Sequence, residues 1–201
     1  MIEKFEHMDE EKRARIINAA ISEFAKSGYD KGSTNVIVKE AEISKGLIFH
    51  YFGSKANLFL YLFNYCTELI TNDLYEKVDL KNGDILERIH DITLKKVILL
   101  QKYPDIFEFV KTVYMESNLQ IKDMIMKQQQ EITKETQVKF FSNIDITYFK
   151  EGIDTEKAMT VIYSTLESIS VKEMGKDDLN LNEVLKKLQD YIDFFKKLFY
   201  K

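Results

Sequence analysis

Residues that interrupt helices are scarce in this sequence, which has one proline and seven glycines among 201 residues. Proline and glycine are the residues that most disfavour a helix interior, so their scarcity favours long helices over short strands joined by turns. Lys, Glu, Leu and Ile are frequent, and apolar residues recur at spacings of three and four. The sequence therefore predicts an all-α fold.

Cysteine and histidine are also scarce, and long apolar runs are missing. The one cysteine, Cys66, cannot form an internal disulfide, which fits a reducing compartment, and three histidines make a structural zinc site improbable. The first residues form no apolar run typical of a signal peptide, and no stretch approaches the roughly 18 apolar residues of a membrane span. We expect a cytoplasmic protein with no membrane partner and no cofactor or metal.

Positive charge is not in excess, because the formal net charge is −4. Residues 1–56 hold as many basic as acidic side chains, so the acidic excess lies in the remainder of the chain. This balance argues against a general nucleic-acid binder. It leaves room for a sequence-specific one, in which only the face on the DNA has to be basic.

Apolar periodicity, capping residues and turn residues predict about nine helices. Asp9, Ser44, Ser54, Asp154 and Asn180 are expected as caps, and Pro104 as the first residue of a helix. The helices cover about residues 10–27, 34–41, 45–51, 55 to beyond 70, 85–100, 104–116, 119–142, 155–174 and 181 onward. We expect two domains, residues 1–54 and 55–201, with the fourth helix running directly from one into the other.

The most informative segment is Ser33–Lys55, where two short helical patterns flank a tight turn near Glu42. This layout is that of a helix-turn-helix, whose second helix enters the major groove of DNA. The second helix carries Lys45, His50 and Tyr51, whose side chains can reach base edges and phosphates.

Residues 16–59 resemble the DNA-binding region of TetR-family transcriptional regulators. Two departures stand out: Glu42 replaces the usual glycine of the turn, and Phe49 replaces a usual tyrosine. The resemblance rests on many positions at fixed spacing, namely Ile17, Ala19, Ala20, Phe24, Gly28, Tyr29, Thr34, Ala41, Ile43, Ser44, Gly46, Phe49, His50, Tyr51, Phe52, Lys55, Leu58 and Phe59. It implies a three-helix reader followed by a helical domain for ligand binding and dimerisation.

The predicted contacts to DNA come from three places in the reader. Thr34 begins the first helix of the motif, Lys45 can donate to a guanine, and Lys55 suits a phosphate clamp. The alternative interpretation makes Phe49 and Tyr51 core aromatics and Lys45 a solvated charge. The full candidate set is Thr34, Asn35, Lys45, Gly46, Leu47, Phe49, His50, Tyr51 and Lys55, with Asn35 and Leu47 at positions that vary in the family.

The last two helices carry broad apolar stripes, and TetR-like proteins usually pair these helices across a twofold axis. The resemblance therefore implies a homodimer, which also suits a reader of palindromic half-sites. Burial within one protomer is the alternative. The candidate dimer residues are Val161, Ile162, Leu185, Leu188, Ile192 and Phe195.

The middle of the chain is rich in Phe, Tyr and Met, which more often fill a core than line a cavity. The resemblance raises the ligand interpretation, since the family's variable domain commonly binds a small inducer. We expect a small apolar or aromatic effector, with Tyr65, Tyr114 or Gln128 as a polar anchor. The candidate lining is Phe63, Cys66, Phe107, Val110, Tyr114 and Met124. Cys66 as a redox sensor is a weaker alternative to Cys66 as a core residue.

The function that these expectations describe is a ligand-responsive repressor, released from its operator DNA by the effector. A helical interaction protein without an inducer remains an alternative. A helical-bundle enzyme is a weaker one, because Glu87-x-x-His90 is a single motif where a di-iron bundle needs two. We find no phosphate loop and no paired nucleophile and base, so an enzyme has no positive support.

Overall fold

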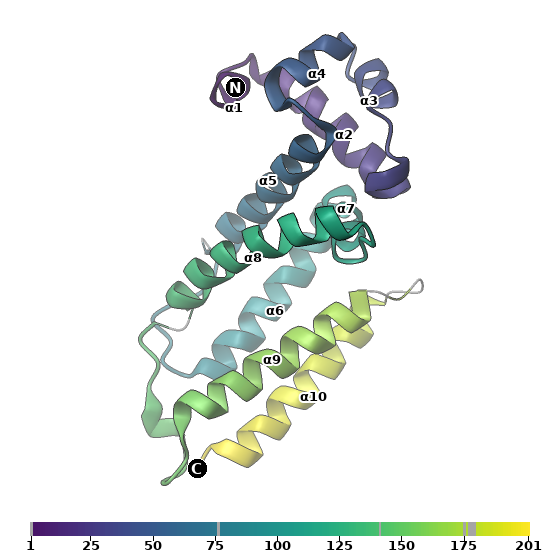
Figure 1. The fold of residues 1–201 in the computed structure, drawn as a ribbon. Helices are drawn as coiled ribbons and strands as arrows, with labels where there is room; N and C mark the ends of the chain where they lie inside the picture. The colour runs from purple at the N-terminus through teal and green to yellow at the C-terminus, as the bar shows by residue number, and fades with distance from the viewer. Residues whose placement is uncertain (1, 76, 141, 175, 177–179) are drawn as a thin grey trace. The chain divides into compact units, whose positions relative to one another are not determined.

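The computed structural model describes residues 2–75, 77–140, 142–174, 176 and 180–201. These residues form helices joined by short connections (Figure 1). The elements are α1 (Ile2–Glu6), α2 (Glu10–Lys31), α3 (Thr34–Glu40), α4 (Lys45–Phe52), α5 (Lys55–Tyr75), α6 (Ile85–Lys102), α7 (Pro104–Tyr114), α8 (Leu119–Phe140), the 3-10 turn η1 (Ile146–Tyr148), α9 (Thr155–Met174) and α10 (Leu181–Phe199). The predicted all-α fold is confirmed.

The predicted helices appear within a few residues of their expected bounds, because local signals set their ends. The Asp9 carboxylate accepts a hydrogen bond from the Lys12 amide, and Asn180 accepts from the amide of Glu183. Pro104 is the first residue of α7, as expected. The short helix α1 was not predicted. At the end of α2, the chain continues helically to Lys31 after a break at Gly28.

The chain packs into two compact units. Unit 1 comprises residues 1–69 and 103–131, and unit 2 comprises residues 70–102 and 132–201. The predicted boundary between residues 54 and 55 separates a DNA-binding domain from a domain for ligand binding and dimerisation, and it stays a prediction. The packing groups α7 and the first part of α8 with the N-terminal helices.

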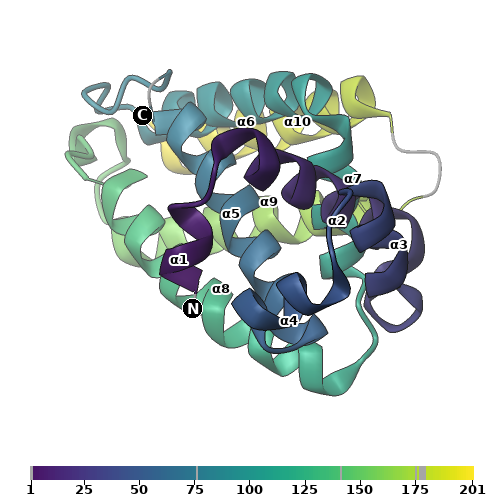
Figure 2. The same cartoon turned by 90° about the horizontal axis from the view of Figure 1, so that it is seen from above.

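Unit 1 has a core in which aromatic rings join helices distant in sequence. The buried Phe59 ring of α5 lies 5.0 Å from the Phe24 ring of α2 and 5.3 Å from the Phe109 ring of α7, both edge to face. Such pairs add specific geometry to the burial of large apolar surfaces. Figure 2 views the helices α1–α4 of this unit from above.

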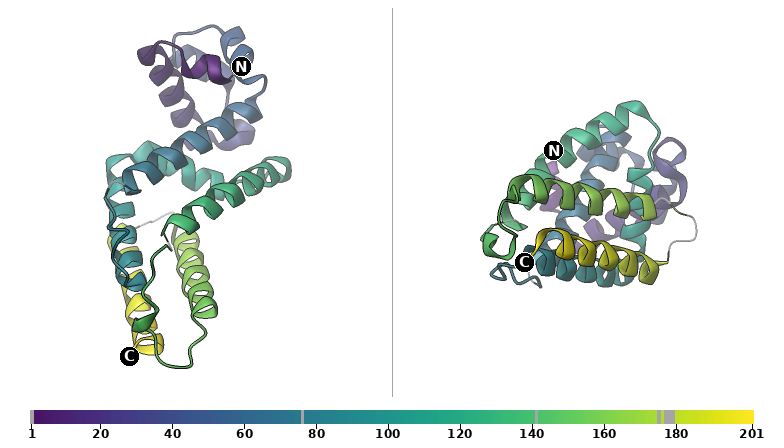
Figure 3. Two further views of the ribbon diagram at one scale, coloured as in Figure 1. Left: turned by 90° about the vertical axis from the view of Figure 1, so that its left-hand side faces the viewer. Right: turned by 90° about the horizontal axis from the view of Figure 1, so that it is seen from below.

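Unit 2 is built from α6, α9 and α10, with α10 between the other two (Figure 3). Its core contains Leu86 from α6, Ile162 from α9, and Leu188, Ile192 and Phe195 from α10. Across the residues described, none of the helices is both long and apolar enough to cross a membrane.

A buried arginine organises one end of unit 2. Arg88 is 1% exposed, and its guanidinium donates to main-chain carbonyls rather than to a carboxylate. It donates to the carbonyl oxygens of Phe140 and Ser142, each at 2.7 Å, and to that of Asn82. Five fixed donors allow one side chain to satisfy carbonyls from two loops. Arg88 thereby holds the end of α8 beside the start of α6.

We expect Arg88→Leu to lower the free energy of unfolding by about 3 kcal/mol or more, because buried carbonyls lose charged donors. The stability of Arg88→Lys should lie between those of the wild type and Arg88→Leu, since one ammonium cannot reproduce the forked donors of a guanidinium. Urea unfolding measures both values. A loss below about 1 kcal/mol for Arg88→Leu would contradict this role.

Candidate nucleic-acid interface

Helices α3 and α4 form the helix-turn-helix, and a left-handed residue makes the turn between them. Glu42 has φ = 54°, and the Ile43 amide then donates back to the Val38 carbonyl at 2.9 Å. A left-handed conformation costs a residue with a Cβ about 1–2 kcal/mol, so glycine would fit better here. The turn is nevertheless closed by this hydrogen bond.

The inner face of the reader is apolar and closed. Ile37 and Ala41 of α3 and the following turn, and Ile48 and Phe52 of α4, are at most 2% exposed and belong to the core of unit 1. Because α3 packs against α2 and α4 packs against α3, the opposite faces of the two helices are set in place. The rigid inner packing thus decides which side chains point outward.

The outward face of α4 carries most of the residues predicted to contact DNA. Lys45, Gly46, Phe49 and His50 are exposed, and Asn35 of α3 is exposed as well. Phe49 is 39% exposed, so it is a surface ring and not a core aromatic. Thr34 and Leu47 are partly buried. The arrangement brings a cation, an imidazole, an amide and an apolar ring onto neighbouring surfaces.

Gly46 has no structural requirement for glycine within the protein. Its φ is not positive, and a Cβ built there would meet no atom within 4 Å. Glycine inside a helix costs about 0.5–1 kcal/mol relative to alanine. Gly32 differs, because a Cβ there would lie 2.5 Å from the Phe24 ring. A glycine at position 46 is therefore best explained by the close approach of a binding partner to α4.

Tyr51 lies at the edge of the reader, packed against a residue that sequence reasoning missed. The fully buried Phe5 of α1 contacts Tyr51 at 5.6 Å between ring centroids, Phe52 at 4.8 Å and Tyr61 of α5 at 5.4 Å. A five-residue helix has too short an apolar period to be recognised. An isolated Phe before the capping residue Asp9 is the one signal that could have indicated it.

Lys55 has a structural role in this geometry. Its ammonium donates to the carbonyl oxygens of Tyr29 at 2.9 Å, Asp30 at 3.2 Å and Gly32 at 3.2 Å. It also lies 4.6 Å from the centroid of the Tyr29 ring. A lysine at the carbonyl end of a helix satisfies unpaired acceptors and the helix dipole. The three donors of the group are thus already engaged, and its predicted phosphate contact stays a prediction.

Comparison with known proteins shows which family has a similar DNA-binding region. The sequence pattern described as "Bacterial regulatory proteins, tetR family" matches residues 16–62, from α2 to the first half of α5. Over these residues the chain has the DNA-binding region of the TetR family of transcription regulators. The resemblance drawn from the sequence is therefore confirmed.

Individual relatives match over different extents. The HTH-type transcriptional regulator YuxN of Bacillus subtilis is 46% identical over 55 residues, which cover 27% of this chain and 19% of that protein. The fatty acid metabolism regulator protein of Bacillus subtilis is 24% identical over 160 residues, covering 78% of this chain and 80% of the relative. The solved structure of Bacillus subtilis FadR in complex with stearoyl-CoA has a TM-score of 0.63 at 21% identity, covering 89% of this chain and 96% of the other.

The residues expected to line an effector pocket lie in unit 1 and are largely packed. Phe63 and Cys66 are buried in its core, and Val110 and Met124 pack against that core. Phe107 is 6% exposed, and the Tyr114 hydroxyl accepts from the Gln129 amide at 3.2 Å. Burial raises the pKa of the Cys66 thiol to about 12, so the thiolate that redox chemistry needs is disfavoured.

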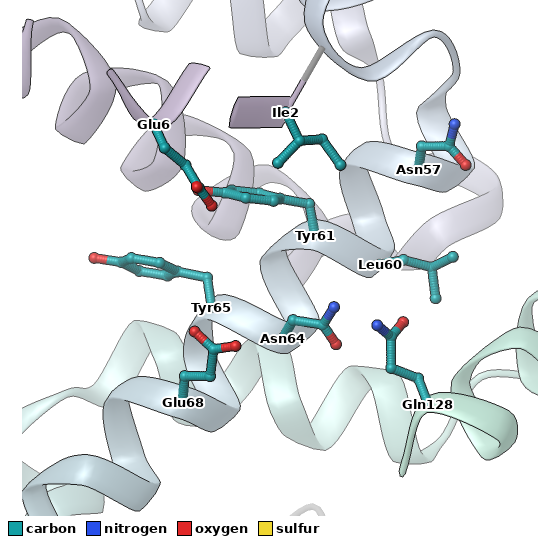
Figure 4. Close-up of a pocket in the computed structure, with 9 residues that line it drawn as sticks. All are labelled: Ile2, Glu6, Asn57, Leu60, Tyr61, Asn64, Tyr65, Glu68 and Gln128. Atoms are coloured by element: carbon teal, nitrogen blue, oxygen red, sulfur yellow. The ribbon is translucent and has the colours of Figure 1, made fainter. Parts of the chain in front are cut away.

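Unit 1 also contains a cavity of about 340 Å³, which opens along α5 (Figure 4). Its lining differs from the predicted one, although it includes Tyr65 and Gln128, two of the three alternatives for a polar anchor. Helix periodicity could have found the α5 stripe, but the contribution of α1 depends on packing. The lining residues are Ile2, Glu6, Asn57, Leu60, Tyr61, Asn64, Tyr65, Glu68 and Gln128.

The candidate dimer residues divide between core and surface. Ile162, Leu188, Ile192 and Phe195 are at most 4% exposed and fill the core of unit 2, as the alternative interpretation had it. Leu185 is partly buried, and Val161 is 51% exposed. Other apolar residues on the surface of α10 lie outside the candidate dimer set, namely Tyr191, Phe194 and Leu198.

The glutamate of the Glu87-x-x-His90 motif forms an ordinary ion pair. The Glu87 carboxylate pairs with the Lys196 ammonium, which joins α6 to α10. In the part of the chain that the structure describes, no three His, Cys, Asp or Glu side chains gather as metal ligands would.

We expect Lys55→Met to lower the free energy of unfolding by about 1–2 kcal/mol, because three carbonyls at the end of α2 lose a charged donor. Lys45→Met is the matched control. Lys45 is exposed, so its stability should stay within about 0.5 kcal/mol of the wild type. Thermal unfolding compares the two. If the two variants are equally stable, the structural role of Lys55 is wrong.

Proposed function

We propose that this TetR-family regulator is a cytoplasmic repressor that binds a pseudo-palindromic operator as a homodimer and releases it on binding an effector. The observation that carries this proposal is the outward face of α4, where Lys45, Gly46, Phe49 and His50 are exposed on a rigidly packed helix. A helix presented in this way enters the major groove, where base edges differ between all four base pairs.

Each exposed side chain then has a chemical role. Lys45 donates to guanine O6 and N7, and Leu47 and Phe49 offer apolar contacts to thymine methyl groups. His50 and Thr34 donate to phosphates and set the register, with Asn35 and Tyr51 beside them. Gly46 lets the α4 backbone approach the DNA closely. The net charge of −4 does not oppose this, because the attraction is local to this face.

We expect Lys45→Ala to weaken binding to the preferred operator by about 1–3 kcal/mol and to relax the preference for one base pair. Gly46→Ala should leave the protein equally or more stable and still weaken operator binding, because the added methyl affects only the complex. Operators come from selection on genomic DNA, and fluorescence anisotropy gives the affinities. Asp105→Ala, on α7, is the control. If selection yields no preferred sequence, the DNA-reading role is wrong.

The dimer surface that we propose differs from the set expected at first. It consists of Val161 on α9 and of Tyr191, Phe194 and Leu198 on α10, all between 37% and 53% exposed. The three α10 residues follow spacings of three and four, so they lie on one helix face. A contiguous apolar face of aromatic residues is typical of an obligate interface. Pairing about a twofold axis would bury it and present two readers to two half-sites.

We expect Phe194→Glu with Leu198→Glu to give a folded monomer, since both side chains lie outside the core of unit 2. Operator affinity should fall by a factor of more than about 100, because one reader binds one half-site without its partner. Sedimentation and circular dichroism measure mass and folding. Lys186→Glu, on the same helix, is the control. A wild-type chain that is monomeric at micromolar concentration would contradict the proposal.

The effector that the relatives suggest is an acyl-CoA. One solved relative is a FadR in complex with stearoyl-CoA, and a curated relative is a fatty acid metabolism regulator. An acyl chain agrees with the expectation of an apolar effector and with the Phe, Met and Leu content of unit 1. It can release the operator only by binding one conformation of the dimer more tightly than the other.

We expect stearoyl-CoA to lower operator affinity at micromolar concentration, and free coenzyme A to leave it unchanged, because the apolar chain supplies most of the binding energy. Val110→Trp should keep operator binding and lose this response, since the larger ring fills space next to the core. Anisotropy with labelled operator measures each. If no acyl-CoA changes the affinity, the acyl-CoA effector is excluded while the DNA-binding role stands.

A further inference from the structure

The cavity of about 340 Å³ in unit 1 has a lining unlike that of an acyl-chain tunnel. Six of its residues form one stripe along α5, from Asn57 to Glu68, at helical spacings of three and four. Helix α1 adds Ile2 and Glu6, and α8 adds Gln128 (Figure 4). The volume lies within the range of about 300–1,000 Å³ that small-molecule sites occupy.

The charges in this cavity are all of one sign. Glu6 and Glu68 contribute carboxylates, and no lysine or arginine is part of the lining. Among the described residues, neither carboxylate has an ion-pair partner within 4.0 Å. Arg13 lies near Tyr61, and its guanidinium donates to the main-chain carbonyl of Glu6. The two acidic side chains therefore remain available to a cation.

The rest of the lining includes an acceptor without a partner and two aromatic faces. The Asn64 side-chain oxygen is buried and has no hydrogen-bond partner. A buried carbonyl oxygen favours a donor, so the N–H group of a ligand would satisfy it. The Tyr61 and Tyr65 rings stack at 6.5 Å with an angle of 20°, and aromatic faces attract cations. Ile2 and Leu60 supply apolar surface.

We propose that this cavity is a binding site for a small organic cation, an amine with an aromatic or apolar body. Its ammonium would lie between Glu6 and Glu68 and donate to Asn64, and its body would pack on Tyr61 and Leu60. An anionic acyl-CoA does not fit this lining, so the cation site is separate from the effector proposed above. It would take its ligand whether or not the protein binds DNA.

The site is also joined to the DNA-reading helix through α1. Ile2 and Glu6 line the cavity, while Phe5 between them is buried against Tyr51 and Phe52 of α4. A ligand that bridges α1 and α5 would hold Phe5 in place beneath α4. Occupancy would thus favour the arrangement of the reader seen here, and this consequence rests on the proposed DNA-binding function.

Calorimetry with three compounds of similar body tests the site directly. Phenethylamine carries the ammonium, 2-phenylethanol is neutral, and 3-phenylpropionate is anionic. We expect phenethylamine to bind wild-type protein at least about tenfold more tightly than 2-phenylethanol, and 3-phenylpropionate to show no binding. The proposal is overturned if phenethylamine shows no heat at millimolar concentration or if the neutral alcohol binds equally well.

Variants locate the binding. Glu68→Gln should weaken phenethylamine about fivefold, and so should Asn64→Ala, which removes the acceptor. Glu108→Gln, an exposed carboxylate on α7 outside the lining, is the matched control and should bind like wild type. Thermal unfolding checks that each variant is folded. Equal weakening in Glu68→Gln and Glu108→Gln would mean that net charge, and not this cavity, attracts the amine.

The coupling between amine binding and operator binding is measured separately. Phenethylamine should raise operator affinity in wild-type protein, and Glu68→Gln should need about fivefold more of the amine for the same effect. If the wild type binds operator and phenethylamine without mutual influence, the link through Phe5 is wrong. If no operator binding exists at all, the proposed function fails, while the calorimetric result on the cation site is decided independently.

Discussion

The packing of one ring, Phe59, holds together the elements on which the DNA-reading face depends. Phe59 lies in α5 and contacts Phe24 of α2, Tyr29 at the end of α2 and Phe109 of α7. Since α3 packs on α2 and α4 packs on α3, their position follows from where α2 lies. The ring is fully buried and sits near the start of α5, so the reader is anchored by core packing.

Polar contacts of unit 1 join the same helices, α2, α5 and α7, as the Phe59 ring does. The Tyr29 amide donates to Glu116, and Asn118 donates to Asp30 at 2.8 Å, so the turn between α7 and α8 holds the exit of α2. Lys55 closes this exit from the side of α5. Several independent contacts therefore determine the end of α2. A lysine that a family resemblance assigns to DNA is, in this geometry, part of the scaffold that positions the reader.

Two local compromises mark the functional surface. Glu42 adopts a left-handed conformation without being glycine, and Gly46 is a glycine in a helix that has room for a methyl group. Neither choice optimises the isolated fold, because the first strains the backbone and the second increases the entropy lost on folding. Local departures of this kind gather where a surface is shaped for a partner. Here both lie within five residues, at the tip of the reader.

The sequence by itself determined the all-α fold, most helix bounds, the helix-turn-helix and the exposed face of its second helix. These features depend on signals within a few residues, such as the cap at Asp9, the proline at 104 and the spacing of Ile37, Ala41 and Ile48. Periodicity reports an apolar side of a helix, and it does so without knowledge of the rest of the chain.

Only the tertiary structure decided what lies against each apolar side. The stripe of α10 is wider than one interface, so packing on α6 and α9 chose Ile192 and Phe195 for the core and left Phe194 on the surface. The same holds for Phe5, for the carbonyls that engage Lys55 and for the acidic cavity along α5. Each joins residues 20 or more positions apart, and helical periodicity carries no information at that separation.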